Sequence, residues 1–345
     1  MHDDAIVVGA GVVGCALAWF LARGGLRVRV LEARTMGAGA SGRNSGLVEH
    51  PYDAEQAGLY AETLALLGEV LGDAFPREPA GALLLVEDAA QAHAVAADHA
   101  AFAGLSPTVL DPEALARVEP GLAPDLWACR VHTGHPVAPA HAVEAFAQRA
   151  RAAGVRFEEG RPTAVDALDA PVVVVAAGAD SGALLGTDAI RPLWGATVGL
   201  ALERTPRHAL IDGRISDIQL GAGAPQAPVF SLIGPPGGVV LGSTFLDEEP
   251  DPAAWAQRLL GHGARFWPAL ADARVTFTRA CARPRAADGR PYLGRVRDHV
   301  WVAAGHGGRG ISTGAASARL VADAILAGDD AAIPPALRAS RLRQP

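Results

Sequence analysis

Three glycines near the N-terminus, Gly9, Gly11 and Gly14, follow the spacing G-x-G-x-x-G. Where such a turn joins a strand to a helix, its backbone can approach a pyrophosphate, which then lies at the helix N-terminus where unpaired amides favour anions. Glu32 ends the next apolar run, where a carboxylate accepts hydrogen bonds from a ribose and disfavours a 2′-phosphate. These residues predict a dinucleotide site for NAD or FAD and argue against NADP.

A second group of candidate residues lies near the C-terminus, in the segment CARPRAADGRPYLG, which contains Arg283, Arg285 and Arg290. The planar guanidinium group of arginine meets a carboxylate with two parallel hydrogen bonds. An arginine of this segment therefore suits the binding of an acidic substrate, and equally suits an ion pair on the surface.

Short apolar runs and glycine turns predict the elements that carry these residues. Residues 5–25 predict a strand, a turn and a helix, and residues 26–33 a second strand, which together make a βαβ unit. Residues 171–181 predict a fully buried strand followed by a glycine turn, as in a parallel sheet. Residues 191–279 are rich in Gly, Pro and short alternating runs, which is typical of an antiparallel sheet, and residues 299–328 return to strand, turn and helix.

The pattern predicts an α/β protein with two domains. A discontinuous Rossmann-like domain for the dinucleotide comprises residues 1–75, 140–190 and 280–345. A substrate domain built mainly on an antiparallel sheet comprises residues 76–139 and 191–279.

The composition excludes several classes of function. The chain of 345 residues has a net charge of −7, which argues against nucleic acid as its main partner. It contains no lysine, which excludes a lysine Schiff base with pyridoxal phosphate and a phosphate-loop lysine. Cys15, Cys129 and Cys281 lack metal-ligand or redox spacing, so we expect no metal site. Their low, odd number suits the reducing cytoplasm.

The uncharged segment Ala5–Ala22 approaches the length of a membrane span. It contains the glycine pattern, however, and the Met-His-Asp-Asp sequence before it lacks the positive charge of a signal peptide. We therefore expect a buried strand and helix here, and no transmembrane segment.

Four segments in fixed order resemble the D-amino-acid oxidase family of flavoproteins, which includes glycine oxidase, sarcosine oxidase and D-amino-acid dehydrogenase. They are ARTMGAGASGRNSGLVEH after Glu32, VVVVAAGADS from Val172, ARPRAADGRPYLG from Ala282 and VAAGHGGRGIS from Val302. The resemblance covers the chain from end to end. It implies an FAD-binding α/β domain and a substrate domain with an antiparallel sheet.

The resemblance also implies residues that bind FAD. The pyrophosphate, ribose and adenine would contact Gly9, Gly11, Val12, Val13, Gly14, Glu32, Ala33 and, through its backbone, Thr163. The rest of the cofactor would contact Ala40, Ser41, Ser45, Gly46, Leu47, Ala177, Gly178, His306, Gly307, Gly308, Arg309, Gly310, Ile311 and Ser312.

In the family, an arginine holds the substrate carboxylate while a hydride moves from the α-carbon to flavin N5. By motif position this arginine is Arg283, and Arg285 and Arg290 are expected to form surface or structural pairs. Glycine oxidases carry a helper arginine at the position of Gly308, whereas this chain has Arg309 one residue later. We keep Arg309 as a candidate substrate contact.

The sequence departs from sarcosine-oxidase-like relatives in two respects. They activate oxygen with a lysine, which this chain lacks, so the electron acceptor is either oxygen or a redox partner. They also carry the flavin covalently on a cysteine, at the position of Cys281. A buried cysteine is common in protein cores, so we expect FAD to be bound non-covalently, with a link through Cys281 left open.

Two further hypotheses stay open beside the oxidation of an amino acid or N-substituted amino acid. One is oxidation of a 2-hydroxy acid, as in related L-2-hydroxyglutarate dehydrogenases, for which His50 is the candidate base. The other is a flavin-bearing subunit of a larger complex. A tRNA-modifying relative also exists, but the acidic balance argues against that activity. Trp194, Phe245 and the region Arg214–Ser231 are expected to shape the pocket for a small carboxylate substrate.

Overall fold

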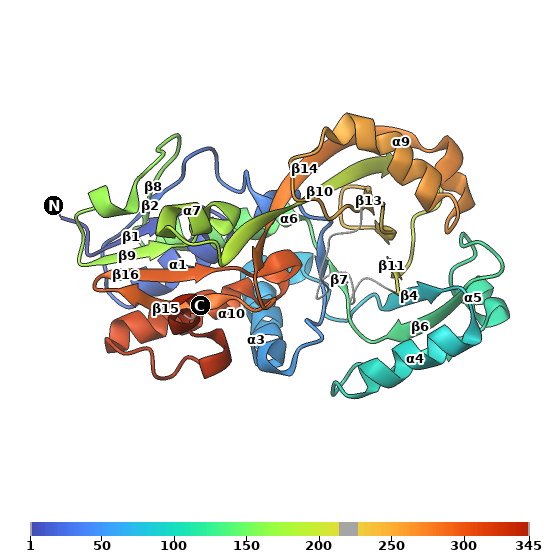
Figure 1. The fold of residues 1–345 in the computed structure, drawn as a ribbon, viewed down its shortest axis with the longest axis horizontal. Coiled ribbons are helices and arrows are strands. Elements are labelled where there is room, and N and C mark those ends of the chain that lie inside the picture. The colour runs from blue at the N-terminus through green and yellow to red at the C-terminus, as the bar shows by residue number, and fades with distance from the viewer. Residues whose placement is uncertain (1, 214–226, 344–345) are drawn as a thin grey trace.

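Two sheets organise residues 2–213 and 227–343, which the computed structural model describes (Figure 1). The first sheet has six strands. In spatial order they are β15 (Tyr292–Arg297), β16 (Val300–Ala304), β9 (Val172–Val175), β1 (Ala5–Val8), β2 (Val28–Leu31) and β8 (Arg156–Glu158). All neighbours are parallel except β15 and β16.

The central strands of the first sheet are continuous apolar runs because both faces of the sheet are covered. All four residues of β1 are buried, as are the last three of β9. On one side lie α1 (Val12–Arg23), α3 (Ala54–Leu71), α6 (Pro139–Ala152) and α10 (Gly310–Ala327). The other side is closed partly by the short helix α7 (Ser181–Leu185). The predicted βαβ unit is confirmed by β1, α1 and β2.

The second sheet has eight strands, and all neighbouring pairs are antiparallel except β11 with β4. In spatial order they are β14 (Arg274–Ala286), β10 (Ile190–Ala201), β13 (Val239–Gly242), β12 (Ser231–Ile233), β11 (Ala209–Asp212), β4 (Ala82–Val86), β6 (Trp127–Val131) and β5 (Thr108–Leu110). Helices α4 (Ala89–Ala100), α5 (Pro112–Val118) and α9 (Pro252–Gly263) accompany this sheet. The predicted α/β class with a mainly antiparallel second sheet is confirmed.

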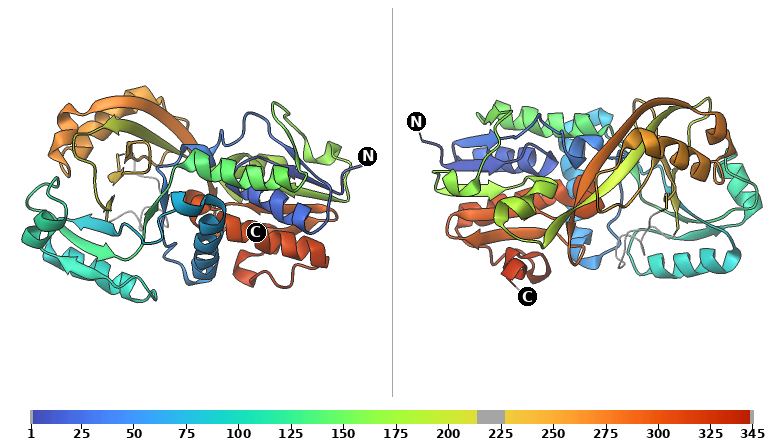
Figure 2. Two further views of the ribbon diagram at one scale, coloured as in Figure 1. Left: turned by 180° about the vertical axis from the view of Figure 1, so that it is seen from behind. Right: turned by 45° about the horizontal axis from the view of Figure 1, so that its top comes forward.

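A short ribbon and one long ladder connect the two sheets. The ribbon pairs β3 (Leu47–Val48) with β7 (His135–Pro136), just after the small helix α2 (Ala40–Arg43). The ladder pairs β10 with β14 over the whole length of both strands, with one irregularity at Gly199/Leu200. Figures 1 and 2 show these two strands running from the second sheet to the first. The exact division into two domains stays a prediction.

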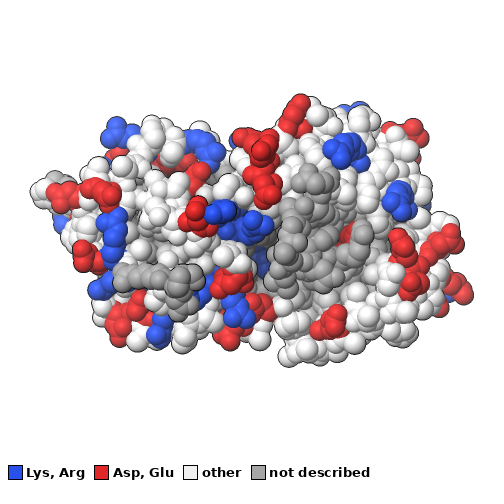
Figure 3. All heavy atoms as spheres, in the orientation of Figure 1, with Lys and Arg blue, Asp and Glu red and all other residues white. Residues whose placement is uncertain are grey.

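The surface carries interspersed charges. On the face shown in Figure 3, acidic and basic side chains alternate over both halves, and basic ones gather where the halves meet. Within the described part of the chain, no helix combines the length and the hydropathy that crossing a membrane requires.

The packing of α1 against the β1 turn depends on the absence of a side chain at Gly14. A Cβ there would overlap the carbonyl oxygen of Gly9. Gly68, by contrast, lies on the exposed face of α3, and a Cβ there would meet no atom within 4 Å.

We predict opposite effects for alanine at these two glycines. Gly14→Ala should lower the free energy of unfolding by about 3 kcal/mol through overpacking, and lower the FAD content of the purified protein. Gly68→Ala should raise it by about 0.5–1 kcal/mol because alanine favours a helix interior. Denaturant unfolding at fixed FAD concentration checks both values. Equal stability of the two variants would contradict the packing argument.

Candidate active site

A cavity of about 490 Å³ lies between the two sheets. Its walls come from the β1–α1 turn, the end of β2, the α2–β3 segment, strands β10, β12 and β14, and the turn before α10. The elements that carry the predicted dinucleotide and substrate residues therefore meet around one space. Most of the predicted site residues line it, and the exceptions are Gly14, Gly46, His50, Arg309 and Ser312.

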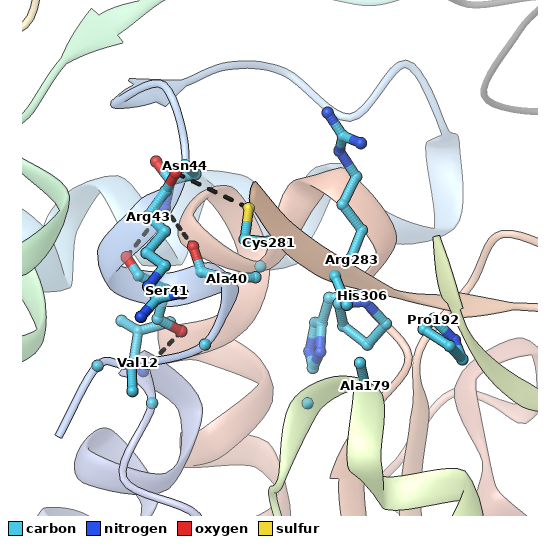
Figure 4. Close-up of a pocket in the computed structure, with 18 of the residues that line it drawn as sticks. Val12, Ala40, Ser41, Arg43, Asn44, Ala179, Pro192, Cys281, Arg283 and His306 are labelled. Carbon is cyan, nitrogen blue, oxygen red and sulfur yellow. Dashed lines mark hydrogen bonds between the residues drawn. The ribbon is translucent and has the colours of Figure 1, made fainter. Parts of the chain in front are cut away.

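The β1–α1 turn forms a cradle in the cavity wall at the start of α1. Gly9 has a φ of 109°, and a Cβ there would lie 2.5 Å from the carbonyl oxygen of Ala176. The N-cap residue of α1 is Gly11, which has no side chain that could cap the helix. The first turn of α1 also contains no acidic residue. The Val12 amide donates to Ser41 Oγ at 3.1 Å, and Ser41 lies beside this helix start (Figure 4). An anion fits this helix N-terminus.

Glu32 stands next to the cradle at the end of β2. Its carboxylate accepts hydrogen bonds from the amides of Ala10 at 2.8 Å and Arg34 at 2.9 Å. These bonds fix the carboxylate against the cavity, which Glu32, Ala33 and Thr163 all line. The arrangement suits a ribose hydroxyl, as the sequence predicts.

His306 provides a second test of whether a dinucleotide fits. The side chain is 3% exposed and lines the cavity, yet its Nε2 has no hydrogen-bond partner among the residues that the structure describes. Burial lowers the His306 pKa to about 4, so the ring is neutral near pH 7. A buried polar atom without a partner is uncommon in proteins, and this one belongs to a residue of the cavity wall. The cradle and Glu32, with His306 in the same wall, fit FAD.

Arg283 lies on β14 and also lines the cavity. Its guanidinium donates to the Thr244 carbonyl at 2.9 Å and to Ser243 Oγ at 2.5 Å, and lies 4.5 Å from the Phe245 ring centre. Burial lowers its pKa, and no carboxylate of the described residues pairs with it. Figure 4 shows its side chain extending away from His306. A partly buried cation without an acidic partner favours an anionic ligand.

The other two arginines of this segment have structural partners. Arg290 donates to Asp53 at 2.8 Å, and this hydrogen bond raises the Arg290 pKa. Arg285 lies 3.9 Å from Asp247 at the surface. Neither lines the cavity, so Arg283 is the arginine of the three that is available to a ligand there.

Arg309 does not reach the cavity, although Gly308 and Gly310 on either side line it. Its NH1 donates to the His50 carbonyl at 2.8 Å and lies 3.7 Å from Glu49 Oε1, and its guanidinium sits 5.1 Å from the Tyr52 ring centre. The backbone turn thus directs this side chain into the protein interior. As a substrate contact, Arg309 finds no support in this geometry.

His50 lies in a buried aromatic cluster instead of the cavity. Its ring centre is 5.4 Å from that of Tyr60 and 5.2 Å from that of Phe102, and its Nδ1 accepts a hydrogen bond from the Tyr52 amide. Burial lowers the His50 pKa to about 4. The geometry gives His50 no path to a substrate in the cavity.

Glu49, its neighbour in sequence, was not among the predicted residues, yet it lines the cavity. Alternation along β3 was an available signal, because Glu49 follows Leu47 by two residues and side chains alternate in an extended strand. Leu47 also lines the cavity, while Val48 between them is fully buried.

Other predicted residues shape the same space. Trp194 and Phe245 line the cavity, as does Ser231. The rest of the predicted pocket region includes residues 214–226, which lie outside the described residues. Cys281 is buried and lines the cavity, with its Sγ 3.8 Å from the Arg43 carbonyl (Figure 4).

Comparison with known proteins agrees with this geometry. The family model described as FAD dependent oxidoreductase (DAO) matches residues 4–324. Glycine oxidase of Bacillus licheniformis is 25% identical, over 94% of this chain and 93% of its own length.

Solved structures show the same fold. Glycine oxidase from Geobacillus kaustophilus superposes with a TM-score of 0.80 at 21% identity, over 95% of each chain. Iminodiacetate oxidase from Chelativorans sp. BNC1 superposes with a TM-score of 0.76 at 23% identity, over 96% of this chain and 97% of its own. Because the family model spans most of its length, the chain belongs to the DAO family and is an FAD-dependent oxidoreductase.

Proposed function

We propose that the protein oxidises an amino acid or N-substituted amino acid by hydride transfer from the α-carbon to flavin N5, with the substrate carboxylate held by Arg283. The observation that carries this proposal is the partly buried Arg283, which lines the cavity and has no acidic partner among the described residues. A substrate carboxylate would supply that partner through two parallel hydrogen bonds.

The chain's own residues would hold the cofactor at both ends. Gly9, Gly11 and Val12 would accept the pyrophosphate, and Glu32 the ribose. His306 would lie beside the flavin end, since it lines the cavity at the turn before α10. Bound FAD supplies a two-electron acceptor for the hydride. We propose non-covalent binding, because Cys281 is buried against the Arg43 carbonyl.

The walls of the cavity would orient the substrate for this transfer. Arg283 fixes the carboxylate, and Trp194 and Phe245 limit the space for the remainder of the molecule. Positioning of this kind supplies much of the rate enhancement when hydride leaves directly from the α-carbon. The names of the relatives support an amine substrate, since glycine and iminodiacetate both carry an amine beside a carboxylate.

The remaining expectations follow from composition. With no lysine in the chain, electrons pass to oxygen by another route or to a redox partner. The three cysteines are buried and unpaired, which supports a reducing compartment, the cytoplasm. No group of metal-ligating side chains occurs in the described part of the chain.

Replacing Arg283 tests the proposal directly. Arg283→Met keeps an unbranched stem and removes the charged guanidinium, so kcat/KM for the amino acid substrate should fall about a hundredfold while bound FAD is retained. Arg285→Met on the same strand removes only an exposed pair and should leave kcat/KM close to wild type. To find the substrate, the purified holoenzyme is mixed anaerobically with glycine, sarcosine, D-amino acids and 2-hydroxy acids. A compound that is oxidised bleaches the flavin absorption. Bleaching that survives in Arg283→Met would refute the clamp.

A substitution of His50 separates amine from alcohol oxidation. An alcohol substrate needs a general base, whose loss costs about a hundredfold or more in kcat. Because His50 lies outside the cavity, we expect His50→Gln to lower the melting temperature while leaving kcat nearly unchanged. Steady-state kinetics and thermal unfolding of the same preparation check this. A hundredfold loss of kcat at unchanged FAD content would favour the 2-hydroxy-acid hypothesis.

A further inference from the structure

Glu49 is a carboxylate in the wall of the cavity that the proposed mechanism does not use. It lies directly after β3, and its side chain shares the cavity with Leu47 and with Arg283 on β14. The cavity therefore holds a cation and an anion on different elements.

The position of Glu49 is fixed by bonds from three directions. Its amide donates to Ser312 Oγ at 3.0 Å, at the start of α10. The next amide, that of His50, donates to Thr133 Oγ1 at 2.8 Å, and the His50 carbonyl accepts from Arg309. A side chain mounted on a backbone held in this way is pre-organised for a ligand.

The electrostatic surroundings keep Glu49 partly compensated. Its Oε1 lies 3.7 Å from Arg309 NH1, and the two side chains are 18% and 13% exposed. Burial raises the Glu49 pKa, and Arg309 opposes that shift. The neighbouring phenols of Tyr52 and Tyr60 have pKa values raised by burial and remain neutral. Glu49 is thus a carboxylate of increased basicity beside the cation of Arg309.

Other charged groups of the cavity wall do not compete for this role. Glu32, Arg34, Arg161 and Asp180 lie with the β1–α1 turn and the ends of β2 and β9. Arg43 lines the cavity from the end of α2 and is exposed to solvent. Glu249 lines the cavity on the side of the second sheet, but is exposed to solvent.

We propose that Glu49 binds the substrate's ammonium group and takes its proton before oxidation. This inference rests on the proposed function, and it assigns the substrate class as a zwitterion spanned by Arg283 and Glu49. In the step, one N–H bond of the ammonium breaks, an O–H bond forms on the Glu49 carboxylate, and the nitrogen keeps the electron pair. The neutral amine can then lose hydride from its α-carbon.

The proposal explains why a carboxylate with an increased pKa stands in this cavity. An ordinary carboxylate is a poor acceptor for the proton of an ammonium group, because their pKa values lie far apart. Burial narrows the pKa difference between Glu49 and the ammonium group, while Arg309 opposes that shift and favours the ionised carboxylate. A hydroxy acid carries no cation and would leave Glu49 without a partner.

Two ligands of nearly equal shape test the binding step without turnover. 2-Aminoisobutyrate carries an ammonium and a carboxylate but no α-hydrogen, and pivalate replaces the ammonium by a methyl group. Each is titrated into the oxidised holoenzyme, and binding is followed by the change in the flavin spectrum. In Glu49→Gln we expect the affinity for 2-aminoisobutyrate to fall about tenfold or more, with the affinity for pivalate unchanged or increased. Glu249→Gln, the matched control, should change neither.

The pH profile gives a second readout. In wild type, Glu49 accepts the proton, so kcat/KM for the identified amino acid should stay high below the pKa of the free amine. In Glu49→Gln it should rise tenfold per pH unit up to that pKa, so that the two enzymes converge at alkaline pH. Glu49→Gln removes the carboxylate from beside Arg309, which keeps its hydrogen bond to the His50 carbonyl. The double variant with Arg309→Met removes both charges and should show the same ligand preference.

The outcomes separate this inference from the proposed function. The role of Glu49 would be overturned if Glu49→Gln and the double variant lost affinity for 2-aminoisobutyrate and pivalate equally. It would also be overturned if neither affinity fell. Binding of neither ligand to wild type, together with no flavin bleaching by any amino acid, would overturn the carboxylate clamp at Arg283 as well. If Glu49 had a purely structural role, kcat/KM of wild type and of Glu49→Gln would not converge at alkaline pH.

Discussion

The long antiparallel ladder between β10 and β14 determines where the two halves of the site meet. Its register runs from Ile190 opposite Ala286 to Ala201 opposite Arg274. Both strands therefore pass from the eight-stranded second sheet to the side of the six-stranded first sheet (Figure 1). Five consecutive residues of β14, 280–284, line the cavity, with Cys281 and Arg283 among them. The distance from the β1–α1 turn to Arg283 is therefore set by a paired strand instead of a flexible loop.

Arg283 and Glu49, two charged residues of the cavity wall, have different electrostatic surroundings. Arg283 packs against backbone and hydroxyl oxygens and the face of Phe245, none of which carries a full negative charge. These neutral groups only partly replace the water that the guanidinium of Arg283 loses, and this favours the binding of an anionic ligand. Glu49 has Arg309 as a partner and is therefore less dependent on a ligand for its compensation. The asymmetry suits a substrate whose carboxylate is always charged and whose amine must change its charge.

Sequence patterns were sufficient where local structure decides the geometry. The glycines of the β1–α1 turn, the buried runs of β1 and β9, and the position of Glu32 follow from short-range rules, and the structure places them as expected. Arg283 needed the resemblance of a whole segment, because three arginines there have similar local surroundings. Only the tertiary partners, Asp53 for Arg290 and Asp247 for Arg285, distinguish them.

The roles of Arg309 and His50 depend on a turn and on a long-range contact, which a linear pattern does not specify. In the turn before α10, side chains at neighbouring positions point in different directions. An arginine at position 309 therefore points in another direction than one at position 308 would. At position 309 it enters the interior, where an uncompensated guanidinium would be costly, and Glu49 from a segment distant in sequence lies within 3.7 Å. The dependence also runs the other way. Without Arg309, burial alone would raise the Glu49 pKa further and favour its neutral form, which cannot accept a proton. The shifted arginine therefore acts on the cavity through Glu49, although its own side chain does not reach it.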